Sequence, residues 1–222
     1  MGRLLTRLNE LGLRENTLIV FCSDNGMNMG HHGIWGKGNG TIPLNMYEES
    51  VKVPLIVSQP GRVPENAVRQ ELLSQYDLRP TLLEWAGVED ADGAALPGRS
   101  FSPLLRGEEV AQPQSVVVFD EYGPTRMIRN REWKYIQRLP AGPNELYDLR
   151  NDPGEQRNLF AEPRQQALIR EMKGGLEDWF RRWADPRRDG ARLPVSGGGQ
   201  WGPVGTGEPV ADCFHEGYGR AT

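Results

Sequence analysis

Residues 17–26 read TLIVFCSDNG, an apolar run that ends in polar residues, and residues 53–57 read VPLIV. Both runs are short and rich in β-branched residues, which is typical of strands covered on both faces of a sheet. Leucines at helical spacing within residues 2–11 predict an amphipathic helix before the first strand. A helix, a strand, a long connection and a second strand in this order favour an α/β fold with a mostly parallel sheet and covering helices.

A second helix is predicted over residues 77–86. Asp77 is a suitable N-cap for it, and Gly87 is a suitable stop. Residues 88–114 are rich in loop-forming residues and carry no clear periodicity. We expect residues 1–112 to form part of one α/β domain.

The pattern changes after residue 112, where short alternating runs replace the long connections. Strands are predicted at residues 116–119, 126–129 and 133–137, with the last two joined as a hairpin. Apolar and aromatic residues at helical spacing predict a helix over residues 164–184, packed on this hairpin. Residues 113–185 are therefore expected to form a small α+β subdomain with an antiparallel sheet, and residues 186–222 an irregular tail rich in glycine and proline.

Composition excludes several classes of protein. The 222 residues carry a formal net charge of −4, whereas a nucleic-acid-binding surface needs a basic excess. No apolar run approaches the 18 or more residues of a membrane span, and the first residues are too polar for a signal peptide. The two cysteines, Cys22 and Cys213, form no disulfide framework, so the compartment is left open.

Asp24 and Asn25 follow the first predicted strand and are candidate metal ligands. In open α/β sheets, ligands collect at the carboxyl ends of strands. Carboxylate and amide oxygens are hard donors that suit Ca²⁺ or Mg²⁺ rather than Zn²⁺. The alternative is a plain turn, because Asp-Asn-Gly is also a common turn sequence.

Residues 30–38, GHHGIWGKG, form a glycine-rich loop that could approach an anion closely. Lys37 offers this anion a point charge. His32 is a candidate for anion contact or proton transfer, and a structural hydrogen bond is the alternative. His31 is better explained as a polar residue of a surface loop.

Three further residues near the loop could react but have simpler explanations. Cys22 is predicted to be a buried, inert thiol, because it lies in an apolar strand and no local histidine is spaced to activate it. Glu48 and Glu49 could act as acid and base. A solvated loop or an ion pair with Lys52 is the favoured explanation for this glutamate pair.

These stretches, read in order, resemble the sulfatase family of the alkaline phosphatase superfamily. The resemblance covers about residues 1–185, and its motifs are residues 16–26, 30–38, 47–57, 77–83, 133–136 and 145–153. It implies a partial alkaline-phosphatase-like sandwich followed by the small C-terminal subdomain.

The resemblance also implies roles for the candidate residues. Asp24 and Asn25 would bind the divalent cation, with Ca²⁺ favoured over Mg²⁺, and Lys37 would bind the sulfate group. His32 matches the histidine of the family's Gly-x-His-Gly segment and would contact the sulfate or the leaving group.

The family's nucleophile is a formylglycine made from a Cys-x-Pro-Ser-Arg motif, and this motif is absent from the chain, as is the family's upstream aspartate pair. We therefore expect the C-terminal portion of an arylsulfatase-like sulfuric ester hydrolase that is inactive by itself. Its partner would be a small sulfate ester or a sulfated sugar, with aryl, choline and sugar sulfates all open. The alternatives are a phosphonate or phosphodiester hydrolase of the same superfamily and a non-catalytic binding remnant.

Overall fold

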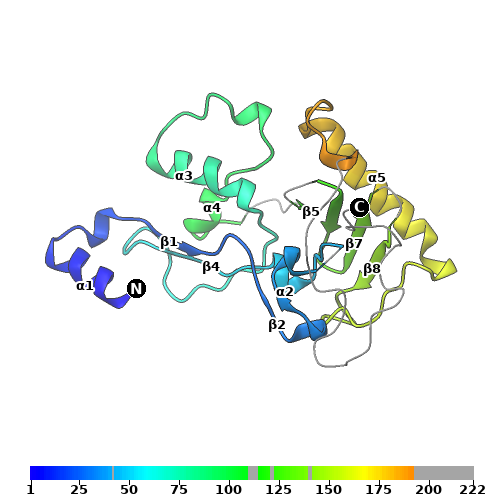
Figure 1. Cartoon of the computed structure of the whole chain (residues 1–222). Helices are drawn as coiled ribbons and strands as arrows, with labels where there is room; N and C mark the ends of the chain where they lie inside the picture. The colour runs from blue at the N-terminus through cyan, green and yellow to red at the C-terminus, as the bar shows by residue number, and fades with distance from the viewer. Residues whose placement is uncertain (42, 110–114, 121–122, 140–141, 193–222) are drawn as a thin grey trace. The chain divides into compact units, whose positions relative to one another are not determined.

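The computed structural model describes residues 1–41, 43–109, 115–120, 123–139 and 142–192 (Figure 1). Its chain forms two compact units, of which the first comprises Met1–Ser23 and Pro54–Pro113 and the second comprises Asp24–Val53 and Gln114–Thr222. The predicted boundary after residue 112 separates a catalytic domain from a C-terminal subdomain. It stays a prediction, because this chain is expected to contain only part of that catalytic domain. Most of the predicted tail, residues 193–222, and Cys213 lie outside the described residues.

The first unit contains the predicted helix and the two apolar strands. Helix α1 spans Gly2–Glu10, and β1 (Ile19–Cys22) pairs with β4 (Leu55–Ser58). The pair is antiparallel, as are all the other ladders among the described residues, so the expectation of a mostly parallel sheet is wrong for these strands. The physical reason is that an apolar run reports burial and carries no information on strand direction.

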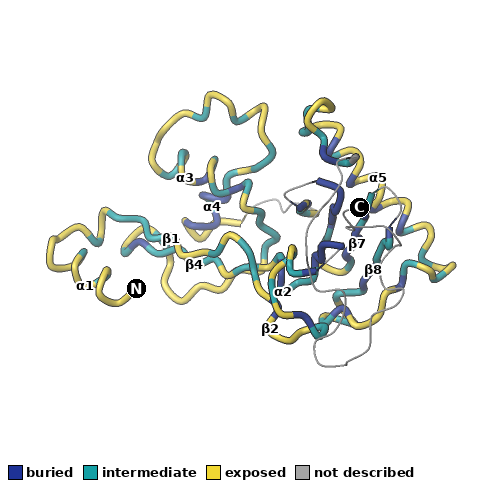
Figure 2. The backbone as a smooth tube through the Cα atoms, in the orientation of Figure 1, coloured by how far each residue is buried: buried dark blue, intermediate teal, exposed yellow. Residues whose placement is uncertain are grey.

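None of the residues of β1 and β4 is buried (Figure 2). Phe21 is 47% exposed, and Ile56, its partner across the strand pair, is 59% exposed. Cys22 is a free and exposed thiol, so the prediction of a buried cysteine is wrong. The apolar sequence of these strands predicts that other segments pack on both faces of the pair. Within this unit, the described residues leave several of its apolar side chains exposed.

Helix α3 (Leu78–Ala86) matches the predicted second helix and ends at Gly87, whose φ is 70°. The side chain of Asp77 does not cap α3. It accepts the backbone N–H groups of Ser74 and Arg99, each at 2.8 Å, and so closes the turn before the helix. Helix α4 (Ser102–Leu105) follows in the loop-rich region. Short 3-10 turns of this unit span Arg14–Asn16, Gln75–Asp77 and Gly93–Ala95.

The second unit is built on a four-stranded antiparallel sheet, as predicted for the C-terminal subdomain. Its strands follow the chain order and are β5 (Val116–Phe119), β6 (Thr125–Arg129), β7 (Trp133–Arg138) and β8 (Glu145–Asp148). Strands β6 and β7 form the predicted hairpin, and α5 (Gln166–Trp183) is the predicted helix. Both predictions are confirmed.

Alternation along the strands gives this sheet two apolar faces. One face packs on α5, whose residues Ile169, Met172, Leu176 and Phe180 recur at helical spacing. The opposite face carries Met127, Ile136 and Tyr147, and Met46 packs against them.

Met46 belongs to the segment Asp24–Val53, which contributes β2 (Asn28–Met29), β3 (Trp35–Gly36) and α2 (Glu48–Val51). The remaining 3-10 turns of the unit span His31–Gly33, Gly38–Gly40, Pro163–Gln165 and Gly190–Arg192. The segment that holds the candidate site residues is thus packed on the antiparallel sheet of its own unit. No helix in the described ranges combines the length and the apolar character needed to cross a membrane.

Candidate functional site

Asp24 and Asn25 begin the second unit, directly after the end of β1. The Asp24 Oδ1 atom accepts the backbone N–H of Asn25 at 2.8 Å. The Asn25 amide donates to the carbonyl of Gly26, which turns its Oδ1 atom toward Lys37. Lys37 Nζ lies 3.3 Å from that oxygen. The structure therefore brings the predicted sulfate-binding lysine to one of the two predicted metal ligands.

The donor set at this position fits a hard divalent cation in kind. Asp24 is exposed and carries a carboxylate, and Asn25 supplies an amide oxygen with two lone pairs, which accepts one hydrogen bond from Lys37. Ca²⁺ takes six to eight oxygen ligands in proteins. Two side chains supply only part of such a shell, so the remaining ligands have to come from other residues or from water.

Gly26 holds this turn against the start of α2. Its N–H donates to the Ser50 carbonyl at 3.0 Å. A Cβ atom built on Gly26 would overlap the Glu49 carbonyl oxygen and would lie 2.9 Å from the Glu49 carbonyl carbon. The two backbones are therefore close enough that only glycine fits between them.

Replacing Gly26 with alanine is expected to lower the free energy of unfolding by about 1–3 kcal/mol, because a backbone has to shift to make room for the methyl group. Chemical denaturation measures this effect. Gly174→Ala is the matched control, since a Cβ atom there meets nothing within 4 Å and alanine favours the helix interior. Equal stability of the two variants would show that the close approach at Gly26 does not matter.

His32 precedes Lys37 by five residues in the glycine-rich loop, and its ring contacts Tyr47 and Glu49. Its φ is 54°, and its ring stacks on Tyr47 with centroids 3.7 Å apart and planes at 6°. The Nε2 atom lies 3.8 Å from Glu49 Oε2. Burial lowers the pKa of His32, and the opposing effect of the Glu49 carboxylate is smaller. The imidazole is therefore neutral at pH 7.

The pKa of His32 is expected to be below 6.5 when followed by NMR titration of the histidine ring signals. Because the unfolded state then binds the proton more tightly, neutral His32 contributes stability above about pH 6.5 that is lost as the pH falls. His32→Gln identifies the signal and should flatten this part of the pH dependence of stability. A His32 signal that titrates above 6.5 would contradict the expectation.

Glu48, the neighbour of Glu49, belongs to a buried ion network rather than to a pair with Lys52. Its Oε1 atom lies 2.7 Å from Lys134 Nζ, and its Oε2 atom accepts from Arg129. Although burial alone would raise the pKa of the Glu48 carboxyl, Lys134 and Arg129 hold it below its usual range. For Glu48, the favoured prediction of a solvated loop or a Lys52 pair is wrong, because its cations come from strands far along the chain.

Glu155 completes this network, and the sequence motifs did not point to it. Its side chain is fully buried; Oε1 lies 2.7 Å from Lys134 Nζ, and Oε2 accepts the Glu48 N–H. His32, Glu49 and Glu155 offer ligand atoms within 4.8 Å of one another, an arrangement that could hold a metal ion. The Lys134 ammonium lies 2.7 Å from Glu155 Oε1 and would repel a metal ion in this group. The carboxylate and amide oxygens of Asp24 and Asn25 stay the candidate that the sulfatase resemblance implies.

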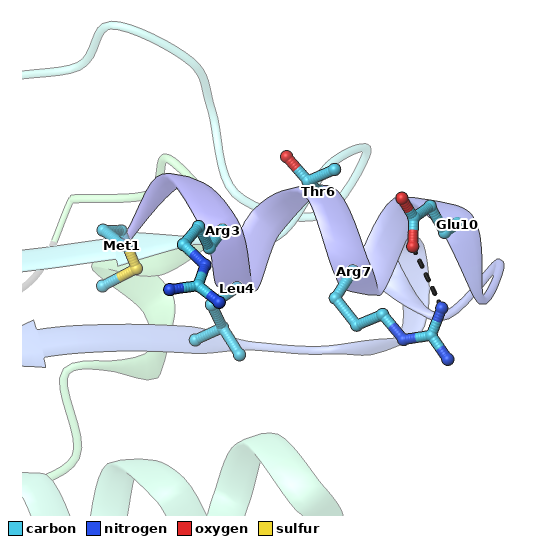
Figure 3. A pocket seen from close by; sticks show the side chains of 6 residues that line it. All are labelled: Met1, Arg3, Leu4, Thr6, Arg7 and Glu10. Carbon is cyan, nitrogen blue, oxygen red and sulfur yellow. Dashed lines mark hydrogen bonds and ion pairs between the residues drawn. The ribbon is translucent and has the colours of Figure 1, made fainter.

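Two surface depressions lie elsewhere in the described chain. One runs along the exposed side of α1 and is lined by Met1, Arg3, Leu4, Thr6, Arg7 and Glu10 (Figure 3). Its polar side chains include the Arg7–Glu10 ion pair, whose members satisfy each other at 3.0 Å. The other lies beside α5 and includes Arg126, Phe180 and Asp189. Neither includes a predicted site residue.

Comparison with known proteins identifies the family. Residues 30–182 match the family described as N-sulphoglucosamine sulphohydrolase, C-terminal. The chain belongs to the sulfatase family. It is 34% identical over 183 residues to the Δ4,5-hexuronate-2-O-sulfatase of Bacteroides thetaiotaomicron, a match that covers 78% of this chain and 37% of that sulfatase.

Solved structures place the chain in the alkaline phosphatase superfamily as well. A protein solved in complex with its substrate D-glucosamine-2-N,6-O-disulfate aligns with a TM-score of 0.72 at 28% identity, over 85% of this chain and 39% of that one. The phosphonate monoester hydrolase of Agrobacterium radiobacter aligns with a TM-score of 0.66 at 26% identity, over 80% of this chain and 37% of that one. The chain thus spans less than half the length of these relatives, and it matches the C-terminal part of a sulfatase.

Proposed function

We propose that this chain supplies one part of the active site of a sulfate-ester hydrolase within a longer polypeptide, and that it is inactive by itself. The observation that carries the proposal is the 3.3 Å contact between Lys37 Nζ and Asn25 Oδ1, next to Asp24. It joins a fixed positive charge to a hard oxygen donor at the position where the sulfatase resemblance expects both.

In this proposal Asp24 and Asn25 hold a divalent cation, with Ca²⁺ favoured over Mg²⁺. When bound, such a cation polarises and neutralises the oxygens of the transferring group. Lys37 stabilises the negative charge that builds on the same group in the transition state. His32 contacts the sulfate or the leaving group, and it does so as a neutral imidazole at pH 7. The nucleophile is expected to be a formylglycine supplied by sequence upstream of this chain.

The proposed substrate is a sulfated sugar. One relative is named for a 2-O-sulfated hexuronate, and one similar structure holds a disulfated glucosamine. The lysine and the metal ligands recognise the sulfate group, which is common to all sulfate esters. Specificity for the sugar would lie in residues 27–45 and 88–114 and in the rest of the polypeptide.

Phosphonate monoester hydrolysis is a second candidate, supported by the similarity to the enzyme from Agrobacterium radiobacter. Sulfate and phosphonate groups are alike in shape and charge distribution, so Lys37 and a cation would serve either. The sulfatase stays the first candidate, because the family model that matches residues 30–182 is that of a sulphohydrolase.

The test compares 4-nitrophenyl sulfate with 4-nitrophenyl phenylphosphonate as substrates of the complete polypeptide loaded with Ca²⁺. We expect the larger kcat/KM for the sulfate ester and no turnover of either substrate by residues 1–222 alone. A larger kcat/KM for the phosphonate would favour the second candidate. Binding of a sulfated sugar without turnover by the complete polypeptide would support a non-catalytic remnant and overturn the proposal.

A further inference from the structure

We propose that Lys134 and Arg138, two buried cations of β7, are positioning residues for Lys37. They hold the backbone of residues 44–46, and these residues in turn hold the backbone at Lys37. The inference rests on the proposed function only for the role of Lys37 itself.

Strand β7 directs both cations to the same face of the sheet. Residues 134, 136 and 138 alternate with the residues that face α5, and Ile136 packs with Met46 on this second face. Lys134 is 0% exposed and Arg138 is 3% exposed. A pair of fully buried cations on one strand is costly unless each has specific partners.

Each cation binds one backbone carbonyl of the segment that covers the sheet. Lys134 Nζ donates to the Met46 carbonyl at 3.0 Å, and Arg138 Nε donates to the Leu44 carbonyl at 3.1 Å. The two carbonyls are two residues apart in a segment that runs along the strand. β7 therefore fixes the position of Asn45 from both sides.

Buried carboxylates keep the two cations in place. Glu48 and Glu155 each lie 2.7 Å from Lys134 Nζ, and Glu145 lies 2.8 Å from Arg138 Nη1. Removing one cation would leave carboxylates buried without their partner, which is the costly way to break such a network. The carbonyls of Leu44 and Met46 are thus bound by buried, ion-paired side chains and not by exposed ones.

Asn45 transmits this position to the loop. It is 3% exposed, and its backbone N–H donates to the Gly38 carbonyl at 3.0 Å. Its side-chain amide donates to the Lys37 carbonyl at 3.2 Å and to Thr41 Oγ1 at 3.1 Å. The peptide that begins at Lys37 is therefore held by a residue that β7 itself holds.

The arrangement explains how an exposed lysine can present its ammonium at a defined position, because Asn45 holds the backbone at residues 37 and 38. The Lys37 side chain is long, and its ammonium is held at Asn25 Oδ1 by a 3.3 Å hydrogen bond, so a shift of the Lys37 backbone would lengthen or break this contact. A misplacement of about 1 Å can cost about 100-fold in rate when it affects an oriented group. Lys134 and Arg138 would act on catalysis through Lys37 and without touching the substrate.

A double-mutant cycle in the complete enzyme tests this proposal, using Lys134→Met, Lys37→Ala and the double variant. We expect Lys134→Met to lower kcat about 10- to 100-fold in the parent and to have no further effect once Lys37 is alanine. Lys134→Arg should recover part of the loss. An equal fold-loss from Lys134→Met in both backgrounds would show a general structural role and overturn the proposal.

Amide hydrogen exchange of the peptide over residues 37–45 gives a readout that does not depend on activity. Lys134→Met should raise its exchange rate, whereas Lys173→Met, at an exposed lysine of α5, should not. If Lys37→Ala leaves kcat unchanged, the proposed function fails, and faster exchange would still support the positioning role. Unchanged exchange in Lys134→Met would overturn it.

Asn45→Asp is the second variant in case Lys134→Met does not fold. It removes the side-chain donor to Lys37 and leaves the cations of β7 in place. The same cycle with Lys37→Ala and the same exchange measurement then apply. Additive losses of kcat together with unchanged exchange would count against the proposal.

Discussion

Lys37→Ala in the complete enzyme is expected to lower kcat by about 100- to 1,000-fold, with a much smaller change in KM. The reason is that a preorganised charge aimed at a transferring group stabilises the transition state more than the ground state. Lys37 meets this description because its ammonium lies 3.3 Å from Asn25 Oδ1, at the proposed cation site. Steady-state kinetics with a chromogenic sulfate ester measures the effect.

Lys52→Ala is the matched control for this experiment. Lys52 is an exposed lysine at the end of α2 and belongs to the same unit. It should keep the parent kcat. An unchanged kcat in Lys37→Ala, or an equal loss in both variants, would remove Lys37 from the proposed active site.

Asp24→Asn is expected to lower the affinity for Ca²⁺ by at least about 100-fold, because loss of a residue that only supports a metal ligand already costs about 10- to 100-fold. The substitution keeps the size of the side chain and removes its charge. Activity measured against Ca²⁺ concentration, after removal of metal with a chelator, reports the shift. Chelation of the parent enzyme should abolish turnover, and added Ca²⁺ should restore it.

Asp178→Asn controls for the general loss of one negative charge, since Asp178 is an exposed residue of α5. It should bind Ca²⁺ as the parent does. Turnover that survives chelation, or a Ca²⁺ affinity that is unchanged in Asp24→Asn, would contradict the assignment of Asp24 as a metal ligand.

Local patterns predicted the elements of the fold well where periodicity and turn residues agreed. The β6–β7 hairpin formed around Asn130, whose side-chain oxygen accepts the N–H groups of Glu132 and Trp133. Helix α5 formed on its apolar stripe. Strand direction was not predictable, because the runs that became β1 and β4 report only that their residues are apolar.

The exposure of Cys22 was missed for a related reason. An apolar strand predicts a covered neighbourhood, but coverage depends on which other segments pack on it. Phe21 and Ile56 are also exposed on the same strand pair. The apolar sequence of a strand therefore predicts that its side chains need to be buried. The described residues of this unit do not bury Phe21 and Ile56.

For the site, the sequence named Asn25 and Lys37 as neighbours of one anion, and the structure adds a direct hydrogen bond between them across 12 residues. It did not predict the network around Lys134. The Lys134 contact with Met46 spans 88 residues, and the Glu48 contact with Glu155 spans 107. A buried ion network at this separation leaves no local motif, because its members look like ordinary surface charges in the sequence.

The most direct test of the account is the intact mass of the native polypeptide that contains this sequence, combined with peptide mapping of its cysteines. We predict a mass well above 24.9 kDa and a formylglycine in a Cys-x-Pro-Ser-Arg motif upstream of Met1. A native polypeptide of 24.9 kDa would contradict the account, because Asp24, Asn25 and Lys37 would then have no nucleophile to serve.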